Sequence, residues 1–397
     1  MKTLKNALLV ATIATIFSCS SDDDNRTIDP GNGGGDIVMN ELTGDITSDS
    51  KLLASIEYTL TGSLTVKSGA TLTIEPGTTI KAKSGRTDVF LAVERGAKLI
   101  AKGTSTMPIT FTSDASSPKA GDWGGLVLAG KAKSNKGTDV QSEVAGLLYG
   151  GTEDTDSSGE LSYVIAEYTG AKINGEQEFN GISFFGVGSG TIVNNIVVSD
   201  GNDDGVEFFG GAVNVTNVYC ANIGDDMFDW TEGYTGTITN AFGVRNDDFD
   251  TASGDPRGIE GDSNGSDATA LPISRPTLKN VTILNLNPDI ALKAGAEIRR
   301  GTEAIISNVL FAAYGEASFD NRIDTNDDKG NGILTITNAV AQGNVGEDKV
   351  GGIITGTVSV ITDGITIPSD NTVTAKAGVG ADLSAFAWAN QSFVVKK

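Results

Sequence analysis

Histidine is absent from the sequence, and cysteine, tryptophan and methionine are scarce. The 397 residues include 2 Cys, 3 Trp and 4 Met, and aromatic residues make up only 6% of the chain. Without imidazole, the chain can use neither histidine acid–base chemistry nor the commonest protein ligand of zinc and copper. Two cysteines exclude a disulfide-stapled scaffold. We expect no disulfide, with Cys220 a small apolar residue that points inward on a strand.

Basic residues are few relative to acidic ones. The chain has 29 Lys and Arg against 51 Asp and Glu, which gives a net charge of −22 at pH 7. A surface of this sign repels nucleic acid and anionic membranes and attracts cations. We therefore expect no nucleic-acid partner.

The first 18 residues have the pattern of an export signal. Lys2 and Lys5 precede an apolar run over 7–17, which is too short for a transmembrane helix. Residues 16–19, Ile-Phe-Ser-Cys, resemble a lipobox, although an ordinary secretory peptide with a chance cysteine is the alternative. The resemblance implies cleavage before Cys19 and acylation of that residue, for instance with palmitate, which would anchor the protein in outer-membrane lipid.

Residues 19–36 are predicted to form a flexible tether. The stretch SSDDDNR after Cys19 resembles the surface-export tag of outer-membrane lipoproteins in some Gram-negative lineages, which implies that the protein faces the cell exterior. The Pro and Gly content of residues 27–36 is typical of a flexible linker. The expected location is the outer membrane, with the folded body held off it by the tether.

The segment from Ile182 to Asp250 repeats itself at an offset of 22 residues, so that NDDGVEFFGGAVNVTNVYC aligns with GDDMFDWTEGYTGTITNAF. A repeat of this length is typical of a solenoid. Its β-branched, alternating segments, bounded by Gly and Asn-Asp turns, predict strands. We therefore predict an all-β fold in which residues 37–397 form a single solenoid domain.

An asparagine followed by apolar residues marks the same position in successive repeats. An amide side chain both donates and accepts hydrogen bonds, so stacked asparagines can satisfy one another at a corner of the solenoid. We expect a structural ladder of this kind. Its members are Asn195, Asn217, Asn240, Asn280, Asn308 and Asn338.

Several phrases resemble a known family, the exported lipoproteins and surface proteins with a pectate-lyase-like right-handed parallel β-helix. The phrases are LTIEPGTTIKA (72–82), GDWGGLVLAGKA (121–132), LLYGGTEDTDSSGELSYVIAEYTG (147–170), NGISFFGVGSGT (180–191) and DDGVEFFGGAVNV (203–215). The resemblance implies a right-handed parallel β-helix with caps at both ends, and residues 383–393 are expected to cap its last turn. It implies no catalytic residues, because the family has no agreed biochemical activity.

Alignment of the repeats separates inward from outward side chains, since neighbours on a strand point to opposite faces. Ile182, Val206 and Phe228 fall on one inward position, and Phe184, Phe208 and Trp230 fall on the next. The outward positions between them carry carboxylates and aromatic residues. The outward residues expected to contact a ligand are Phe185 and Phe209, together with Arg245 nearby.

The candidate site is a row of outward acidic residues. Its members are Asp204, Asp226 and Asp248 at the turns, and Glu207, Asp229 and Asp250 on the strands. Carboxylates about 4.8 Å apart at an effective dielectric constant of about 20 repel one another by roughly 3 kcal/mol per pair. Bound Ca²⁺ would offset this cost, because Ca²⁺ prefers oxygen ligands. Solvated turn-forming aspartates and catalytic carboxylates remain the alternatives.

The leading functional hypothesis is a non-catalytic, lipid-anchored cell-surface β-helix that binds a glycan, the envelope or a protein partner. The alternative is a Ca²⁺-dependent polysaccharide lyase or glycoside hydrolase acting on an acidic polysaccharide. Candidate bases for that chemistry are Arg245, Arg257, Arg299 and Arg300, of which the last two are expected to be structural.

Overall fold

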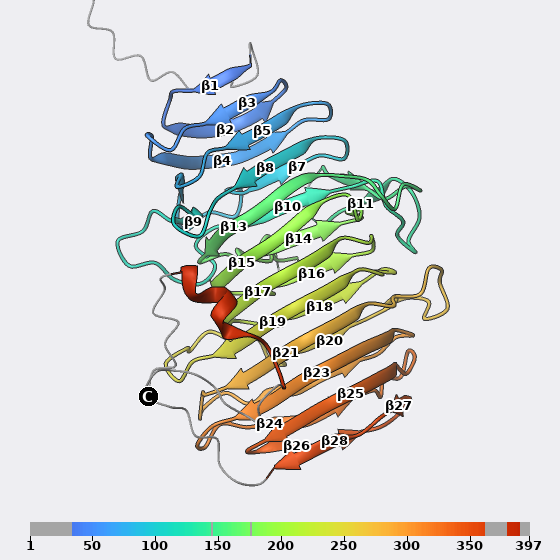
Figure 1. Cartoon of the computed structure of the whole chain (residues 1–397). Helices are drawn as coiled ribbons and strands as arrows, with labels where there is room; N and C mark the ends of the chain where they lie inside the picture. The colour runs from blue at the N-terminus through green and yellow to red at the C-terminus, as the bar shows by residue number, and fades with distance from the viewer. Residues whose placement is uncertain (1–33, 144–145, 175–176, 362–378, 390–397) are drawn as a thin grey trace, which may run out of the picture.

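The computed structural model describes residues 34–143, 146–174, 177–361 and 379–389. Twenty-six strands are joined by parallel pairing into one continuous sheet that winds into an elongated coil (Figure 1). The architecture is all-β and consistent with the right-handed parallel β-helix expected from the sequence. Among the described residues, no helix has the length and apolarity needed to cross a membrane.

Each turn of the coil contributes to three ladders of hydrogen-bonded strands. The first and second ladders share long strands that bend at a corner: β13 (Gly159–Glu167), β15 (Ile192–Gly201), β17 (Asn214–Ile223), β19 (Thr237–Arg245), β21 (Thr277–Asn285), β23 (Glu303–Ala313) and β25 (Ile333–Gln342). Before β13 the first ladder contains β1 (Gly35–Ile37), β3 (Ser50–Leu52), β5 (Thr71–Ile74) and β8 (Lys98–Lys102), and it ends with β27 (Ile353–Thr355). The second ladder contains β2 (Glu41–Ile46), β4 (Tyr58–Val66), β6 (Thr79–Ala82) and β9 (Ile109–Ser113), and it ends with β28 (Val358–Ile361).

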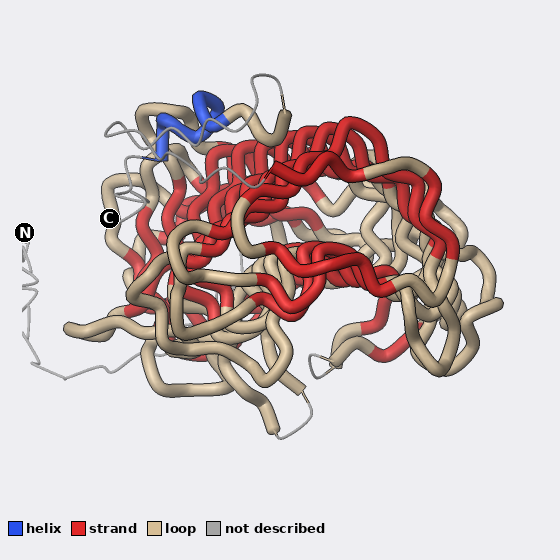
Figure 2. Tube along the Cα trace, turned by 90° about the horizontal axis from the view of Figure 1, so that it is seen from below, coloured by secondary structure: helices blue, strands red, loops and turns tan. Residues whose placement is uncertain are grey.

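The third ladder is made of short strands and carries the candidate site. It starts from the end of β4 and continues through β7 (Leu91–Val93), β10 (Leu126–Ala129), β14 (Ile182–Phe185), β16 (Val206–Phe209), β18 (Phe228–Thr231), β20 (Ile259–Gly261), β22 (Leu292–Ile298), β24 (Phe319–Asp324) and β26 (Val345–Lys349). Figure 2 shows strands of successive turns lying behind one another in flat faces, with the long loops outside them.

The inward positions predicted from the repeat are confirmed. Val206 and Phe228 lie in register with Ile182, and all three are buried in the main core. Phe208 and Trp230 occupy the next inward position and are fully buried. Cys220 is buried in the same core as a free thiol, as expected. Side chains at equivalent positions of successive turns therefore fill the interior of the coil.

The asparagine ladder is also confirmed. Asn217 donates its amide to Asn195 over 3.0 Å, and Asn240 donates to Asn217 over 2.8 Å. The same pattern joins Asn308 to Asn280 and Asn338 to Asn308. All six residues have φ between 48° and 59°, a left-handed conformation that asparagine tolerates better than most residues. The asparagine ladder thus fixes the bend between the first and second ladders of strands.

The described part of the expected cap, residues 383–389, does not lie on the last turn, and residues 390–393 are outside the described residues. The 3-10 helix η1 (Leu383–Ala389) packs on the outside of β15 and β17, in the middle of the coil (Figures 1 and 2). Phe386 lies 5.5 Å from the ring of Tyr219, in an outward apolar cluster with Phe242. The apolar outer surface of the second ladder attracts the segment, and Asn240 fixes it through hydrogen bonds in both directions with the main chain of Asp382.

Candidate functional site

The outward face of the third ladder carries a column of five carboxylates, one on each of five successive strands. Register pairs each of them with the next along the coil, and we call this set the acidic column. Its members are Glu207, Asp229, Glu260, Glu297 and Asp324. The column is flanked by Ser183 before Glu207 and by Lys349 after Asp324. The predicted row of outward acidic residues therefore exists, although some of its residues differ from those predicted.

Arginines neutralise the C-terminal half of the acidic column. Arg257 forms ion pairs with Glu297 and, over 2.9 Å, with Glu260. Arg299 forms ion pairs with Glu260 over 2.5 Å and with Glu297 over 3.4 Å. Lys349 pairs with Asp324 over 2.8 Å. This half of the column is therefore a structural network, in which each acid has a basic partner. The structural role expected for Arg299 fits these contacts.

The N-terminal half lacks such partners. It comprises Glu207 and Asp229 of the column together with three aspartates from the turns before β16 and β18. We call these five residues the acidic cluster: Asp203, Asp204, Glu207, Asp225 and Asp229. Carboxylate oxygens of Asp203, Asp204 and Asp225 lie within 4.8 Å of one another, and so do those of Asp204, Glu207 and Asp229. Asp204 belongs to both groups.

Neutral donors supply the hydrogen bonds of the acidic cluster. Asn180 donates its side-chain amide to Glu207 over 2.6 Å, and Ser253 donates its hydroxyl to Asp225 over 2.6 Å. The backbone N–H of Asp226 donates to Asp204 over 2.9 Å. Within the described ranges, no lysine or arginine forms an ion pair with any of the five carboxylates. The cluster is therefore the part of the outward face without direct ion pairs, although the more distant charges of Arg299 and Lys172 lower the pKa values of Asp229 and Asp203 in part.

Burial raises the pKa of every carboxyl in the acidic cluster. Asp204 and Asp229 are 7% and 8% exposed, and the loss of water around the charge is the largest cause of the raised pKa values of both. For Asp204 the next cause is the charge of Asp203, and for Glu207 it is the charge of Asp229. The pKa of Asp203 is raised to about 8. At neutral pH the cluster must therefore retain protons or bind a cation.

The long loop over residues 131–158 brings one more acidic residue to this face. Burial, followed by the charge of Glu232, raises the pKa of Glu143 to about 7. Glu143 lies close enough to Glu207 for its charge to raise the pKa of that residue as well. The loop is fixed by Tyr149, whose hydroxyl donates to Glu232, and by Lys136, which pairs with Glu232 over 2.7 Å. Glu143 is thus a carboxyl that titrates near neutrality beside the acidic cluster.

The donor set of the acidic cluster fits a hard cation. All of its ligand atoms are oxygens, and carboxylate oxygens within 4.8 Å of one another can share one ion at the Ca²⁺–oxygen distance of about 2.4 Å. The set contains no nitrogen or sulfur ligand, which disfavours zinc and copper. The buried acidic clusters could therefore bind a metal.

Two residues predicted to join the metal site lie elsewhere. Asp248 and Asp250 are exposed and line a separate cleft with Tyr168 and Asp200. The 22-residue period fails at this point, because the loop after β19 inserts extra residues before β20. The strand position after Asp229 is therefore Glu260. Of the remaining predicted ligands, Asp226 pairs with Arg257 over 3.7 Å, whereas Asp204, Glu207 and Asp229 lie together.

The three residues predicted to contact a ligand are buried. Phe185 and Phe209 stack on each other with ring centroids 4.0 Å apart, and the loop over 131–158 covers them with Tyr149. Arg245 is 0% exposed and donates to the backbone carbonyl of Ile223 over 2.6 Å. Burial lowers its pKa to about 10. The expectation of exposed aromatic rings on this face is therefore wrong.

Repeat alignment missed the later members of the acidic column. Glu260 follows Gly258 and Ile259, a pattern that matches Gly205-Val206-Glu207. This three-residue match could have identified Glu260. Asn180 stands two residues before Ile182, as Asp204 stands two before Val206, so the same alignment could have placed it beside the column. No comparable signal was available for Glu143, which reaches the face from a loop outside the repeat.

Comparison with known proteins bears on the fold. A search of curated proteins returned no match. Among solved structures, the chain is similar to the catalytic domain of GH87 alpha-1,3-glucanase in complex with nigerose, with 12% identity and a TM-score of 0.34. That alignment covers 83% of this chain and spans 63% of the glucanase domain. A second similar structure is the A-module of the mannuronan C-5 epimerase AlgE6 from Azotobacter vinelandii, with 9% identity, a TM-score of 0.21, and coverage of 80% of this chain and 91% of the module.

A family model gives the broadest match. The model of the pectate-lyase like beta helix domain matches residues 44–392, a span that contains all three ladders from β4 onward and the whole candidate site. Together with the parallel coil, this match shows that the chain belongs to the pectate-lyase like beta helix domain family.

Proposed function

We propose that the protein is a non-catalytic, lipid-anchored cell-surface β-helix that binds Ca²⁺ at the acidic cluster and, through this face, a glycan, the envelope or a protein partner. The observation that carries the proposal is the change in charge compensation along the third ladder. Glu260 and Glu297 share two arginines, whereas the acidic cluster has the same burial with neutral hydrogen-bond donors only.

The cost of burying the carboxylates of the acidic cluster favours a bound cation over the alternative that these aspartates are solvated turn residues. Solvated aspartates would be exposed and would keep ordinary pKa values. Asp204 and Asp229 are instead buried, and the pKa values of both are strongly raised. A divalent cation would restore the ionised form of several carboxylates together and would displace their protons. Each of the two groups of three carboxylates, which share Asp204, offers several oxygens to one ion, and water would complete the six to eight ligands that Ca²⁺ takes.

Calcium titration calorimetry tests this part of the proposal. Wild-type protein should bind Ca²⁺ with release of protons, and the double variant Glu207→Gln/Asp229→Asn should lose the binding. The matched control is Asp248→Asn/Asp250→Asn, which removes two exposed acids of the separate cleft and should bind as the wild type does. Equal binding by the wild type and by the Glu207→Gln/Asp229→Asn variant would place the ion elsewhere and refute the assignment.

A second function is favoured by Glu143. A carboxyl with a pKa of about 7 beside a carboxylate pair is suited to general acid catalysis of glycosidic bond cleavage. In the alternative proposal the face acts as a Ca²⁺-dependent polysaccharide lyase or glycoside hydrolase on an acidic polysaccharide. Release of reducing or unsaturated ends from a panel of neutral and uronate-containing polysaccharides, lost in Glu143→Gln, would establish this alternative over the non-catalytic proposal.

The anchor is part of the same proposal and rests on the sequence alone. Cys19 and the tether up to residue 33 lie outside the described residues. We propose cleavage before Cys19, acylation of that residue and display on the outer surface of the outer membrane. Labelled palmitate should enter the wild-type protein and not Cys19→Ala. Labelling that persists in the variant would refute the anchor.

A further inference from the structure

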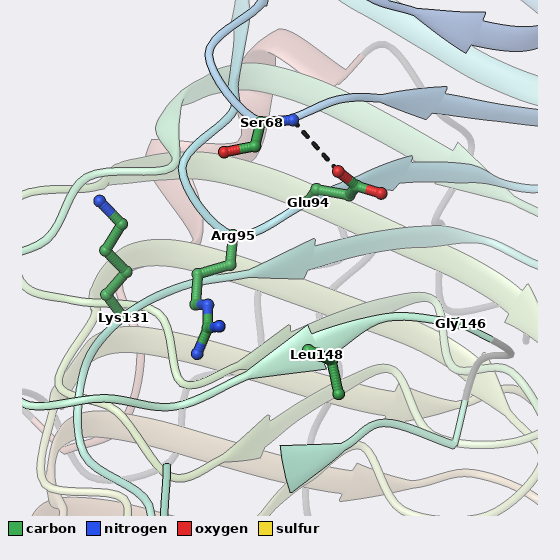
Figure 3. Close-up of a pocket in the computed structure, with 6 residues that line it drawn as sticks. All are labelled: Ser68, Glu94, Arg95, Lys131, Gly146 and Leu148. Atoms are coloured by element: carbon green, nitrogen blue, oxygen red, sulfur yellow. Dashed lines mark hydrogen bonds between the residues drawn. The ribbon is translucent and has the colours of Figure 1, made fainter. Parts of the chain in front are cut away.

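A second pocket lies on the third-ladder side of the coil, several turns before the acidic cluster. It has a volume of about 380 Å³ and is lined by Ser68, Glu94, Arg95, Lys131, Gly146 and Leu148. Figure 3 shows the ammonium of Lys131 directed toward the Ser68 side of the pocket and the guanidinium of Arg95 directed the other way, toward Leu148. The lining comes from the turns that follow β4, β7 and β10, and from β12 (Leu148–Tyr149), which pairs with β11 (Val140–Gln141).

Lys131 provides a positive charge without an acidic partner. Three lysines follow β10 in close succession, and two of them form ion pairs, Lys133 with Asp154 and Lys136 with Glu232. Among the described side chains, none forms an ion pair with the ammonium group of Lys131. Lys98, Lys119, Lys279 and Lys329 also lack an ion pair among the described side chains, but Lys131 is the one of these lysines that lines this pocket.

Arg95 is held in place on the other side of the pocket. Its guanidinium donates to the backbone carbonyl of Gly150 over 2.8 Å and to Asp139 over 2.5 Å. The Gly150 contact is independent of charge and positions the group, whereas the side chain of Asp139 is 64% exposed. A fork of N–H donors fixed by one neutral acceptor can donate to an oxygen of a ligand that competes with the exposed carboxylate of Asp139.

The one carboxylate of the pocket is already neutralised. Glu94 pairs with the ammonium of Lys67 and accepts the backbone N–H of Ser68 over 3.1 Å. Glu94 and Asp139 therefore offset Lys67 and Arg95, and the charge of Lys131 remains. Leu148 is 43% exposed and gives one wall of the pocket an apolar surface.

We propose that this pocket binds a small ligand that carries a terminal oxyanion, either a carboxylate or a phosphate, on a body of about the size of a monosaccharide. Lys131 contacts the oxyanion, and Arg95 and Leu148 contact the body of the ligand, Arg95 by donating to one of its oxygens. The volume lies at the small end of the range for ligand pockets. The site shares no residue with the acidic cluster and needs no cation.

Titration calorimetry in the presence of a chelator tests the proposal and keeps it separate from the Ca²⁺ site. The probes are glucose 6-phosphate, glucuronate, inorganic phosphate and glucose. At least one of the three anions should bind with a Kd on the order of 1 mM or tighter, while glucose should not bind. The first two probes distinguish a phosphate from a carboxylate ligand. Binding by glucose as strong as by the anions, or by none of the probes, would overturn the proposal.

Three variants assign the binding to the pocket. Lys131→Ala should weaken the best anion at least about tenfold, because a charge-assisted hydrogen bond contributes about 1.5–3 kcal/mol. Lys133→Ala, whose ammonium pairs with Asp154, should bind as the wild type does. Asp139→Asn should strengthen binding, because it removes the competitor for Arg95. Asp139 has φ of 60°, which asparagine tolerates. Equal affinities for the wild type and for Lys131→Ala and Asp139→Asn would refute the assignment.

Discussion

Replacement of Asp204 by asparagine should have opposite effects on stability in the absence and in the presence of Ca²⁺. Asp204 belongs to both groups of carboxylates in the acidic cluster. Asparagine keeps the oxygen that accepts the backbone N–H of Asp226 and removes the charge. We expect the variant to be more stable than the wild type without Ca²⁺ and to lose most of the stabilisation that Ca²⁺ gives.

The size of the first effect follows from the crowding of the carboxylates. Two unit charges about 4.8 Å apart repel by about 3 kcal/mol at an effective dielectric constant of about 20. Proton uptake by the folded state limits this cost to about 1.4 kcal/mol for each unit by which the pH exceeds the unfolded pKa. We therefore expect Asp204→Asn to raise the free energy of unfolding by about 1–3 kcal/mol at about pH 8.

The sign of the pH dependence is fixed by linkage. Burial and the neighbouring charge of Asp203 raise the folded-state pKa of Asp204 above its unfolded value near 4. The folded state therefore binds more protons, and the destabilisation by Asp204 is complete above the folded pKa and vanishes as the pH falls toward the unfolded pKa. The advantage of the variant should accordingly shrink between about pH 8 and about pH 4.5.

Thermal and guanidinium unfolding, with a chelator and with excess Ca²⁺, measure both effects. A ligand at about 100 times its Kd stabilises by about 2.7 kcal/mol, which raises the Tm of a chain of this length by about 3 °C. Asp250→Asn, in the exposed cleft, is the control and should respond to Ca²⁺ as the wild type does. A variant that is no more stable than the wild type in chelator at high pH, or that gains as much from Ca²⁺, would refute the reasoning.

Three further predictions concern the scaffold. Arg299→Ala removes the guanidinium that Glu260, Asp262 and Glu297 all contact, although Arg257 still pairs with both glutamates, and should cost about 3 kcal/mol in guanidinium unfolding. The exposed Lys102, paired with Glu160, should cost at most about 1 kcal/mol when replaced by alanine. Asn217→Ala should lower the free energy of unfolding by about 2–3 kcal/mol, because it removes hydrogen bonds of the asparagine ladder and leaves alanine in a left-handed φ. Asn217→Gly should lower it less, because glycine tolerates that φ. Equal losses for the two variants would show that the backbone conformation is unimportant. Phe386→Ala should weaken the local packing of η1 by about 3 kcal/mol. Proteolysis near η1 should therefore become faster at temperatures well below the melting of the coil. Unchanged cleavage would show that Phe386 does not hold the segment.

The fold could be predicted from the sequence because every turn of the coil needs the same kinds of residue at its inward positions and at its corner. Phe208 and Trp230 must both fill the interior, and Asn195 and Asn217 must both occupy the same left-handed corner. These demands recur at each turn, so they leave a period in the sequence.

The outward face could be predicted only in part, because loops of different length determine what covers it. Phe185 and Phe209 alternate with inward residues and so point outward, as expected, but the loop over 131–158 folds back on them. Asp248 shares a spacing with Asp226, yet the insertion before β20 moves it to another cleft. Periodicity determines the direction in which a side chain points, whereas its exposure depends on segments that do not repeat.

The distribution of arginines along the acidic column is the strongest reason to regard the acidic cluster as a binding site. A solenoid can place any residue at an outward position, so a purely structural carboxylate that is buried should acquire a basic partner or be replaced by a neutral residue. Both solutions occur in this ladder: Ser183 stands before Glu207, and Arg257 and Arg299 accompany Glu260. Glu207 and Asp229 have no ion-pair partner, and the charge of Arg299 offsets the raised pKa of Asp229 only in part. A cation bound at the acidic cluster, as proposed above, would supply the missing positive charge, and the opposite responses expected of Asp204→Asn with and without Ca²⁺ follow from that proposal.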